Sequence, residues 1–435
     1  MRRNRPKLFF ILLIISLFAI ETKAQEPLKI TLDQALEIAL TESNSIKIAD
    51  MTVEKSGYAK KGSYASLYPN ISVSSSYQRT LKKQVMVMDM GGNPMEIKVG
   101  RDNNISASAS ASMPLINAPL WESLKLSALD VELAVEQARS SKVSMISQVK
   151  QAFYGVLLAK ESLAVMTQVY DNARENYEKT LQRFNVGKAS EVEKLRAQVN
   201  MMSSEPNVSS AENAVLLATW QLKAVMGLDL ETDIEAVGDL KDYTDELLTP
   251  YVSEENLGNN SSLLQFDIQN RMLESNIRMQ KKQYLPSLAA SINYNYSAMG
   301  DDKLSWFPSS TAAVSLSIPV FDGFQKHYNI KQSKISKDML DVQRIDTERQ
   351  IRIAIRNYND KIALYVKNYT AANATVEIAQ KSYEISQKMY EVGKATLVEL
   401  NDAQLALQQA QLTQAQAIYN FMVAKASLDE LIGKE

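Results

Sequence analysis

The sequence predicts an α+β membrane protein, made mostly of long α-helices with four β-strands per chain. Three observations carry this prediction. Glycine (14) and proline (11) are scarce among the 435 residues, which favours long helices. Four segments alternate between apolar and polar residues with the period of two that strands have. Two closely similar stretches, 184–193 and 390–399, lie 206 residues apart, which indicates an internal two-fold repeat.

The N-terminus has the pattern of a secretory signal peptide. Four basic residues within positions 2–7 precede an apolar run of 13 residues from Leu8 to Ile20, and Ala24 offers a small residue for cleavage. The run is shorter than the roughly 20 residues that a membrane-spanning helix needs, so a retained anchor is the less favoured alternative. We therefore predict a signal peptide over 1–24. Because the chain has no cysteine, a lipid anchor on an N-terminal cysteine is excluded.

Composition excludes several functions. Without residues 1–24 the net charge changes from −2 to about −6, which does not suit nucleic acid. His327 is the one histidine, which leaves no Cys/His metal site and no histidine base for a nucleophile. A lone histidine is most often a surface or packing residue. With no phosphate-binding glycine loop either, we predict no catalysis, no cofactor and no metal.

The mature chain is expected to start with two helices. Thr31 and Gln34 have the spacing of a capping box at the start of a short helix over 30–40. Asn44 and Ser45 restart the helical pattern, which continues to about Leu67.

The strands are predicted at 71–78, 105–113, 288–296 and 311–318. Residues 81–102 and 299–308 are expected to be exposed loops, the first because of its Gly91-Gly92-Asn93-Pro94 stretch. One face of each strand carries serine and asparagine rather than charge. That fits a barrel with lipid outside and water inside, although an ordinary half-buried sheet alternates too.

Two features favour the membrane interpretation. Aromatic residues cluster at strand ends, as interfacial belts do: Tyr77, Tyr294, Tyr296, Trp306 and Phe307. Four strands cannot close a barrel, because the smallest barrels have about eight, so several chains must share one.

Each half continues with a long helical hairpin. Helical sequence runs from about 119 to 184 and from about 323 to 390, which at 1.5 Å per residue gives roughly 100 Å for each helix. Gly187 and Gly393 reverse the chain, and return helices follow over 190–226 and 396–432. Pro206 is expected to bend the first return helix.

An acidic segment separates the halves. It could be a disordered linker or a small packed belt, and its apolar residues, such as Ile234 and Leu240, favour the belt. The predicted organisation is therefore a signal peptide (1–24), a first repeat (25–227), an acidic linker or equatorial belt (228–259) and a second repeat (260–435).

Over the whole mature length the chain resembles the TolC-type outer-membrane efflux family. The order, duplication and spacing of several pieces carry the resemblance: 32–40, 285–288, 318–323 and the two tip motifs with their following Ala-Gln. It implies a homotrimer with a shared 12-stranded β-barrel in the outer membrane, an α-barrel in the periplasm and an equatorial belt. The sequence departs from the family at Ser45, where proline is usual, at Phe324, where a second glycine is usual, and at Pro206.

The resemblance also suggests two sites. Tyr390, Glu399 and Asp402 correspond to positions where the family closes its periplasmic end, and the two carboxylates share one helix face. If that face looks into the bore, the pore constriction would favour cations; the alternative is a solvated face with no pore role. The tips would meet an adaptor protein through Val186, Gly187, Lys188, Val392, Gly393 and Lys394.

The expected function is a passive exit duct of a tripartite efflux or type I secretion system, in the outer membrane of a Gram-negative bacterium and extending into the periplasm. The implied partners are a periplasmic adaptor (membrane fusion) protein, an inner-membrane pump of the RND or ABC type and outer-membrane lipid. Two alternatives stay open: an exported coiled-coil scaffold and the periplasmic adaptor itself. The exported substrate cannot be read from the sequence.

Overall fold

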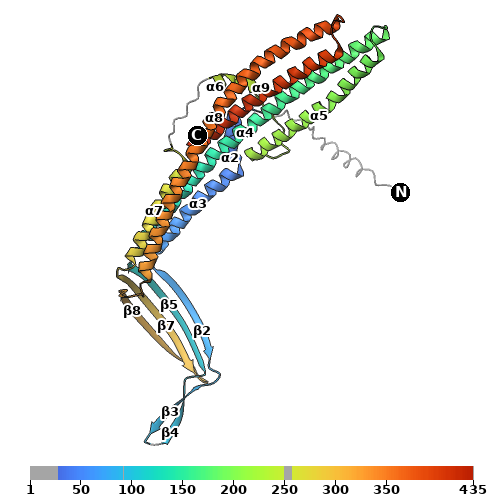
Figure 1. Ribbon diagram of the computed structural model, residues 1–435. Coiled ribbons are helices and arrows are strands. Elements are labelled where there is room, and N and C mark those ends of the chain that lie inside the picture. Colours follow the sequence, from blue (N-terminus) through green and yellow to red (C-terminus); the bar gives the residue numbers. More distant parts are fainter. Residues whose placement is uncertain (1–27, 92, 249–256, 435) are drawn as a thin grey trace, which may run out of the picture. The chain divides into compact units, whose positions relative to one another are not determined.

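The computed structural model describes residues 28–91, 93–248 and 257–434 (Figure 1). The predicted signal peptide lies outside the described residues. Contacts divide the chain into two compact units: Met1–Lys47, Ser141–Asn256 and Arg352–Glu435 form unit 1, and Ile48–Ser140 and Leu257–Ile351 form unit 2. Each unit takes segments from both predicted repeats, so the repeat boundaries stay a prediction.

Unit 2 contains a four-stranded antiparallel sheet in the order β2-β5-β7-β8. Its strands are β2 (Asn70–Arg79), β5 (Asn103–Ile116), β7 (Ser287–Gly300) and β8 (Ser305–Ser317). All four predicted strands are present and longer than predicted. The central pairing of β5 with β7 joins the two hairpins into one sheet, so β2 and β8 are its edges.

The prediction of a loop over 81–102 was wrong. That segment forms a second sheet, the hairpin of β3 (Gln84–Met90) and β4 (Asn93–Val99). Gly91 has φ +72, the left-handed value that tight hairpin turns need, so this glycine belongs to a hairpin turn instead of a long loop. The expected loop over 299–308 is also too long, because β7 continues to Gly300 and β8 begins at Ser305.

The helical part of unit 2 consists of most of α3 (Asn44–Ala65), α7 (Ser261–Lys282) and the adjoining parts of α4 (Ala118–Asn185) and α8 (Gln325–Glu391). Ion pairs join α7 to both neighbours. Glu122 of α4 is 1% exposed and binds Arg278 and Lys282 of α7, while Arg344 of α8 binds Asp267 of α7 at 3.0 Å. Polar contacts therefore supplement the apolar packing between these helices.

Unit 1 contains α2 (Leu32–Glu42), α5 (Glu191–Met226), α9 (Leu397–Ile432) and the remaining parts of α4 and α8. Its core includes Phe153, Leu222 and Phe421, which are almost fully buried. The α5 helix continues through Pro206, and the hydroxyl of Ser210 donates to the Pro206 carbonyl at 2.8 Å. The bend predicted at Pro206 stays a prediction.

The segment 228–248 is packed in unit 1. Strand β6 (Ile234–Ala236) pairs in parallel with β1 (Leu28–Ile30), and the short helices η2 (Leu240–Tyr243) and α6 (Thr244–Leu248) follow. Leu240 and Leu247 are each 1% exposed. The rest of the acidic segment, up to 256, lies outside the described residues.

Gly227 connects α5 to this packed segment. It ends α5 with φ +75, and a Cβ at this position would stand 2.8 Å from the Glu42 carbonyl oxygen, between α2 and α3. Among the described residues, no helix is both long and apolar enough to cross a membrane.

Candidate functional site

One face of the main sheet is lined by serine and asparagine. The register places Ser72, Ser74 and Ser76 of β2 opposite serines of β5, and each pair of hydroxyl oxygens is 2.8 Å apart. The same face continues across β7 and β8 with Ser291, Asn293, Asn295, Ser309 and Thr311. These hydroxyl and amide groups bond to one another or to water, so this face is suited to an aqueous lumen.

The opposite face of the sheet is apolar and uncovered. Val73 is 78% exposed, Ile292 62% and Val314 67%. Paired strands place these side chains next to further apolar residues, including Ala107, Ala109, Ala312 and Leu316. This face, which is apolar in its middle apart from Ser75 and Ser310, would be costly in water and is suited to lipid contact.

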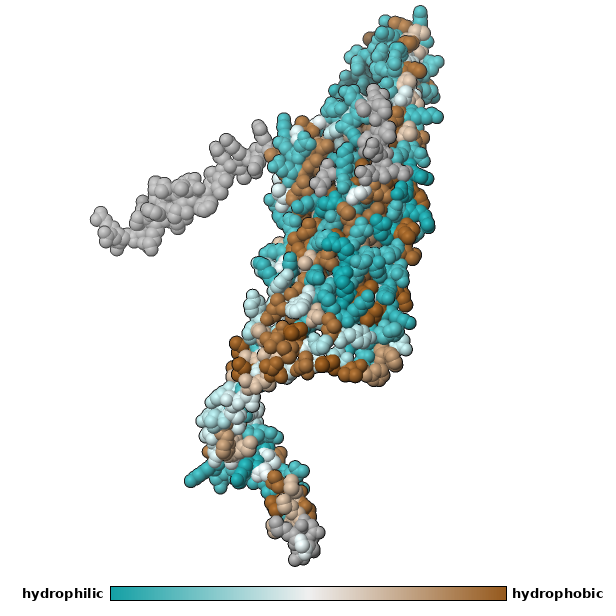
Figure 2. All heavy atoms as spheres, turned by 90° about the vertical axis from the view of Figure 1, so that its left-hand side faces the viewer, coloured by the Kyte–Doolittle hydropathy of each residue, from teal (hydrophilic) through white to brown (hydrophobic). Residues whose placement is uncertain are grey.

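Aromatic residues mark both ends of the apolar face. At the end near the β7–β8 turn, Tyr296 and Trp306 stack with their ring centroids 4.8 Å apart. At the end near the helices, sequence analysis missed a second group that is more than 40% exposed: Tyr68, Trp121, Tyr284, Phe321 and Phe324. Figure 2 shows brown, apolar residues gathered where the helices meet the sheet. Their positions just outside the strands are the signal that could have revealed them.

Phe324 shows how the chain accommodates its departure from the family pattern. Its φ is +67, the left-handed region that disfavours a side chain by about 1–2 kcal/mol and suits the glycine expected there. The ring packs edge to face on Phe321, with centroids 5.4 Å apart. Contact between these two exposed rings offsets part of that cost if they lie at the membrane boundary.

A carboxylate ties the loops together at the other end of the sheet. Asp301, in the β7–β8 turn, accepts hydrogen bonds from the Lys83 ammonium at 2.9 Å, the Asp102 backbone N–H at 2.9 Å and the Arg101 guanidinium at 3.2 Å. The hydrogen bonds from Lys83 and from the Asp102 backbone hold the pKa of Asp301 at about 2. Lys83 and Arg101 flank the β3–β4 hairpin, so this contact anchors its base to the main sheet.

The two helical hairpins end in the same tip geometry. Gly187 and Gly393 have φ +74 and +75, and in each case the following lysine N–H bonds to a carbonyl five residues earlier, as in a Schellman motif. Capping boxes at Ser190 and Thr396 then start the return helices. Val186 and Val392 are 69% and 67% exposed. Both tips therefore present an exposed valine, a glycine and a lysine (Lys188 and Lys394).

Tyr390 is held against α4 near the tip. It is 5% exposed, its hydroxyl is 2.8 Å from that of Thr180, and the Arg183 guanidinium lies 5.5 Å from its ring centroid. Lys179 of α4 binds Glu391 of α8 at 2.8 Å. Hydrogen bonds to Glu391 and, to a smaller extent, to Glu175 raise the pKa of Lys179. These contacts couple α4 to α8, and sequence reasoning missed the α4 residues.

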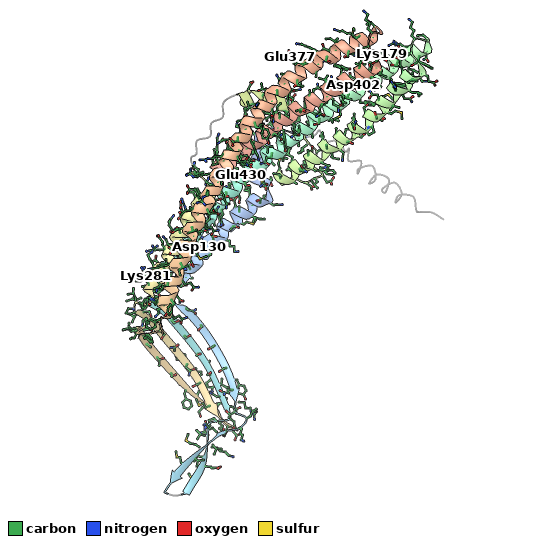
Figure 3. All side chains as sticks on the ribbon, viewed as in Figure 1. Asp130, Lys179, Lys281, Glu377, Asp402 and Glu430 are labelled. Carbon is green, nitrogen blue, oxygen red and sulfur yellow. The ribbon has the colours of Figure 1, made fainter. Side chains whose placement is uncertain are left out.

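Glu399 and Asp402 lie on α9 in different environments. The Glu399 carboxylate accepts from the Thr396 backbone N–H at 2.7 Å and from its hydroxyl at 3.0 Å, and these bonds lower its pKa. Glu193 caps α5 in the same way, so the capping spacing in the sequence accounts for both glutamates. Asp402 is exposed on α9 (Figure 3). Tyr390 is thus bound to α4, whereas Glu399 is bound to its own helix cap.

The sequence matches the family described as "Outer membrane efflux protein" over residues 35–228 and 252–434. The chain belongs to this family. The matched ranges include the four strands of the main sheet and both tips, and they confirm the resemblance read from the sequence motifs.

Two relatives and one solved structure illustrate the similarity. TolC of Vibrio cholerae is 23% identical over 387 residues, which cover 86% of this chain and 84% of the relative. The cobalt-zinc-cadmium resistance protein CzcC of Cupriavidus metallidurans is 21% identical over 305 residues, covering 70% of this chain and 71% of the relative. The crystal structure of the Campylobacter jejuni CmeC outer membrane channel has a TM-score of 0.74 at 18% identity, over 92% of this chain and 85% of that chain.

As an outer membrane efflux protein, the chain is located in the outer membrane of a Gram-negative bacterium. The mostly helical fold with its strands matches that of solved outer-membrane channels.

Proposed function

We propose that the protein is the exit duct of a tripartite efflux or type I secretion system, working as a homotrimer that conducts solutes passively through the outer membrane. The observation that carries the proposal is the four-stranded sheet with a hydroxyl-lined face and an uncovered apolar face. The proposal includes the 12-stranded barrel shared by three chains, the internal two-fold repeat, and the adaptor and pump as partners.

The sheet edges support closure by several copies. β2 and β8 each pair on one side within the chain, so the other side presents unpaired backbone groups. The four strands alternate in direction, and β2 of one copy would therefore run antiparallel to β8 of the next. Three copies would give 12 strands, an even number as expected for bacterial barrels.

Exposed apolar stripes on the helices of unit 2 also favour neighbouring copies. On α3, Ile48, Met51 and Tyr58 are 62–65% exposed at helical spacing. On α8, Ile335, Met339, Val342 and Ile345 are 58–67% exposed. If the copies form a ring, the α3 stripe contacts one neighbouring copy and the α8 stripe contacts the other. Such an interface is heterologous, and the ring closes it.

The first experiment tests membrane insertion and oligomeric state. Membrane fractionation followed by gel electrophoresis with and without heating should give an integral, heat-modifiable trimer, and planar bilayers should show a steady conductance. A chain extracted without detergent, or one that migrates as a monomer in both gels, would support the exported scaffold instead. An adaptor would contain one long helical hairpin, whereas the described part of this chain contains two, α4–α5 and α8–α9.

We further propose that Tyr390, Glu399 and Asp402 contribute to the periplasmic constriction. Glu399→Gln with Asp402→Asn removes both charges and retains the capping box, which accepts glutamine at this position. Single-channel conductance should rise and polyvalent cation block should weaken. Glu193→Gln, at the matching cap of α5, is the control. Unchanged recordings for the double variant would leave Glu399 with a capping role alone.

The tips are proposed to dock a periplasmic adaptor that links the duct to an RND or ABC pump. Bulky substitutions at Gly187 and Gly393 should abolish export while trimers still assemble, because a Cβ at either position meets no atom within 4 Å and the strain is confined to the turn. Val199→Asp, at an exposed valine of α5 outside the tips, is the control. Normal export in the glycine variants would contradict the docking role.

The cargo is left open. One relative is named for cobalt-zinc-cadmium resistance and another for alkaline protease secretion, so members of the family serve different exports.

A further inference from the structure

The β3–β4 hairpin has a composition that the proposed duct does not explain. Four of the protein's 18 methionines, Met86, Met88, Met90 and Met95, fall within ten residues of sequence. An isolated two-stranded hairpin has little core to fill, so methionines are not needed there for burial. Ion pairs of Asp301 with Lys83 and Arg101 anchor the base of the hairpin to the main sheet.

The strand register places all four of these methionines on one face of the hairpin. Met88 is directly opposite Met95, and Met86 is two residues before Met88 on the same strand. Directly opposed residues have Cβ atoms about 4.5–5.5 Å apart, and the next residue on the same face is about 7 Å away. Each methionine has three rotatable bonds, so the three sulfur atoms can converge on one point above the sheet.

These thioethers are accessible. Met86 is 47% exposed, Met88 44% and Met95 50%. Charged residues of β4 are kept apart from them, because Glu96 and Lys98 occupy the alternate positions and lie on the opposite face. The cluster therefore offers sulfur ligands without a carboxylate that would attract hard cations.

Thioether sulfur is a soft, uncharged ligand that selects monovalent soft cations over hard divalent ones. We propose that Met86, Met88 and Met95 form a binding site for Cu(I) or Ag(I) on the β3–β4 hairpin. Three neutral sulfur atoms suit a cation with a single charge and a low coordination number. The site lies within one hairpin of one chain, so it requires neither the trimer nor the partners of the proposed duct.

The test is a titration of the full-length protein in detergent with Ag(I), monitored by isothermal titration calorimetry. The wild-type protein should bind about one Ag(I) per chain, and the variant Met86→Leu/Met88→Leu/Met95→Leu should bind none at this site. The matched control, Met51→Leu/Met202→Leu/Met339→Leu, removes three methionines that are 57–67% exposed and lie on three separate helices. This control should bind like the wild type.

Two further readouts identify the ligands. Thioethers do not titrate, so the affinity should be equal at about pH 5.5 and about pH 7.5, whereas an imidazole ligand would lose affinity at the lower pH. X-ray absorption of the Cu(I) form, kept under a reductant that does not bind copper, should show a shell of sulfur alone. Zn(II) should not bind to the hairpin.

Leucine retains the apolar surface, so the variant separates metal binding from packing. If the methionine face serves only to pack on another copy, the wild type and both variants will bind Ag(I) equally or not at all, and the proposal is overturned. Pronounced weakening at pH 5.5, or nitrogen or oxygen in the absorption shell, would also overturn it. Gel mobility without heating and helical circular dichroism verify that the leucine variant is folded.

Discussion

The ion cluster around Glu122 allows a stability prediction to be worked from the structure. The Glu122 side chain is 1% exposed and accepts hydrogen bonds from Lys282 Nζ at 2.6 Å, Arg278 Nε at 2.8 Å and the Ser275 hydroxyl at 3.1 Å. Burial alone raises the pKa of this carboxyl, but the bonds from Lys282, Arg278 and Ser275 outweigh it and bring the pKa from 4.5 to about 2. The variant Glu122→Gln retains the shape and removes the charge.

The expected loss follows from that pKa. A fall from 4.5 to about 2 corresponds to about 3 kcal/mol of stabilisation of the folded state. Arg278 and Lys282 are 51% and 32% exposed, so water competes for them and the net loss should be about 1–2 kcal/mol. The loss should be measured at about pH 7 by guanidinium unfolding, followed by helical circular dichroism at one fixed protein concentration.

The pH dependence has a definite sign. The folded-state pKa of Glu122 lies below the unfolded value, so its stabilisation is complete above about pH 4.5 and is lost as the pH falls toward about 2. The free-energy difference between wild type and Glu122→Gln should therefore be constant from neutral pH down to about pH 5.5 and shrink below about pH 4.5.

Glu132→Gln is the matched control. Glu132 also joins α4 to α7, through Arg271, but both side chains of this pair are about half exposed (46% and 54%). Its removal should cost less than about 1 kcal/mol. The reasoning is refuted if the two glutamine variants lose equal stability, or if the loss in Glu122→Gln is the same at acid and neutral pH.

Three other substitutions test the fold and the sheet faces. In unfolding titrations, Gly227→Ala should destabilise the protein more than Gly187→Ala. Both substitutions cost about 1–2 kcal/mol because of the left-handed φ, but the Cβ at position 227 also clashes with backbone 2.8 Å away. Equal losses of stability would contradict this prediction. Val73→Lys on the apolar face should cost about 2–4 kcal/mol and reduce the heat-modifiable oligomer, whereas Ser74→Lys should assemble and shift ion selectivity in bilayers; the reverse result would invert the assigned faces. Thr396→Ala should cost about 1 kcal/mol in thermal unfolding by removing the cap of α9, and a neutral effect would show that the cap is dispensable.

The regular elements were the easiest to predict. The return helices were expected at 190–226 and 396–432 and are observed as Glu191–Met226 and Leu397–Ile432. Local chemistry decides these boundaries, because serine or threonine caps one end and glycine ends the other. The hairpin over 84–99 was missed because its glycines and charges resemble a loop when only local sequence is considered.

Candidate site residues were harder to predict. Glu399 lies three residues after Thr396, as a capping residue does, and three residues before Asp402, on the helix face proposed to line the pore. Its contacts within one chain are those of a capping residue. Tyr390 was selected by its place in the motif, but its partners Thr180 and Arg183 lie about 210 residues earlier in the chain, and no local pattern indicates such a contact.

The sequence by itself determined the long helices, the four alternating strands, the two glycine tips and the family, because these depend on residue spacing along the chain. Only the tertiary structure decided that β5 pairs with β7, that the serines of β2 and β5 form a continuous polar face, and that Glu122 and Asp301 join distant segments. It also decided that the four methionines of the β3–β4 hairpin share one face. Strand register and side-chain contacts depend on which segments meet in space, and a period of two or 3.6 carries no information about that choice.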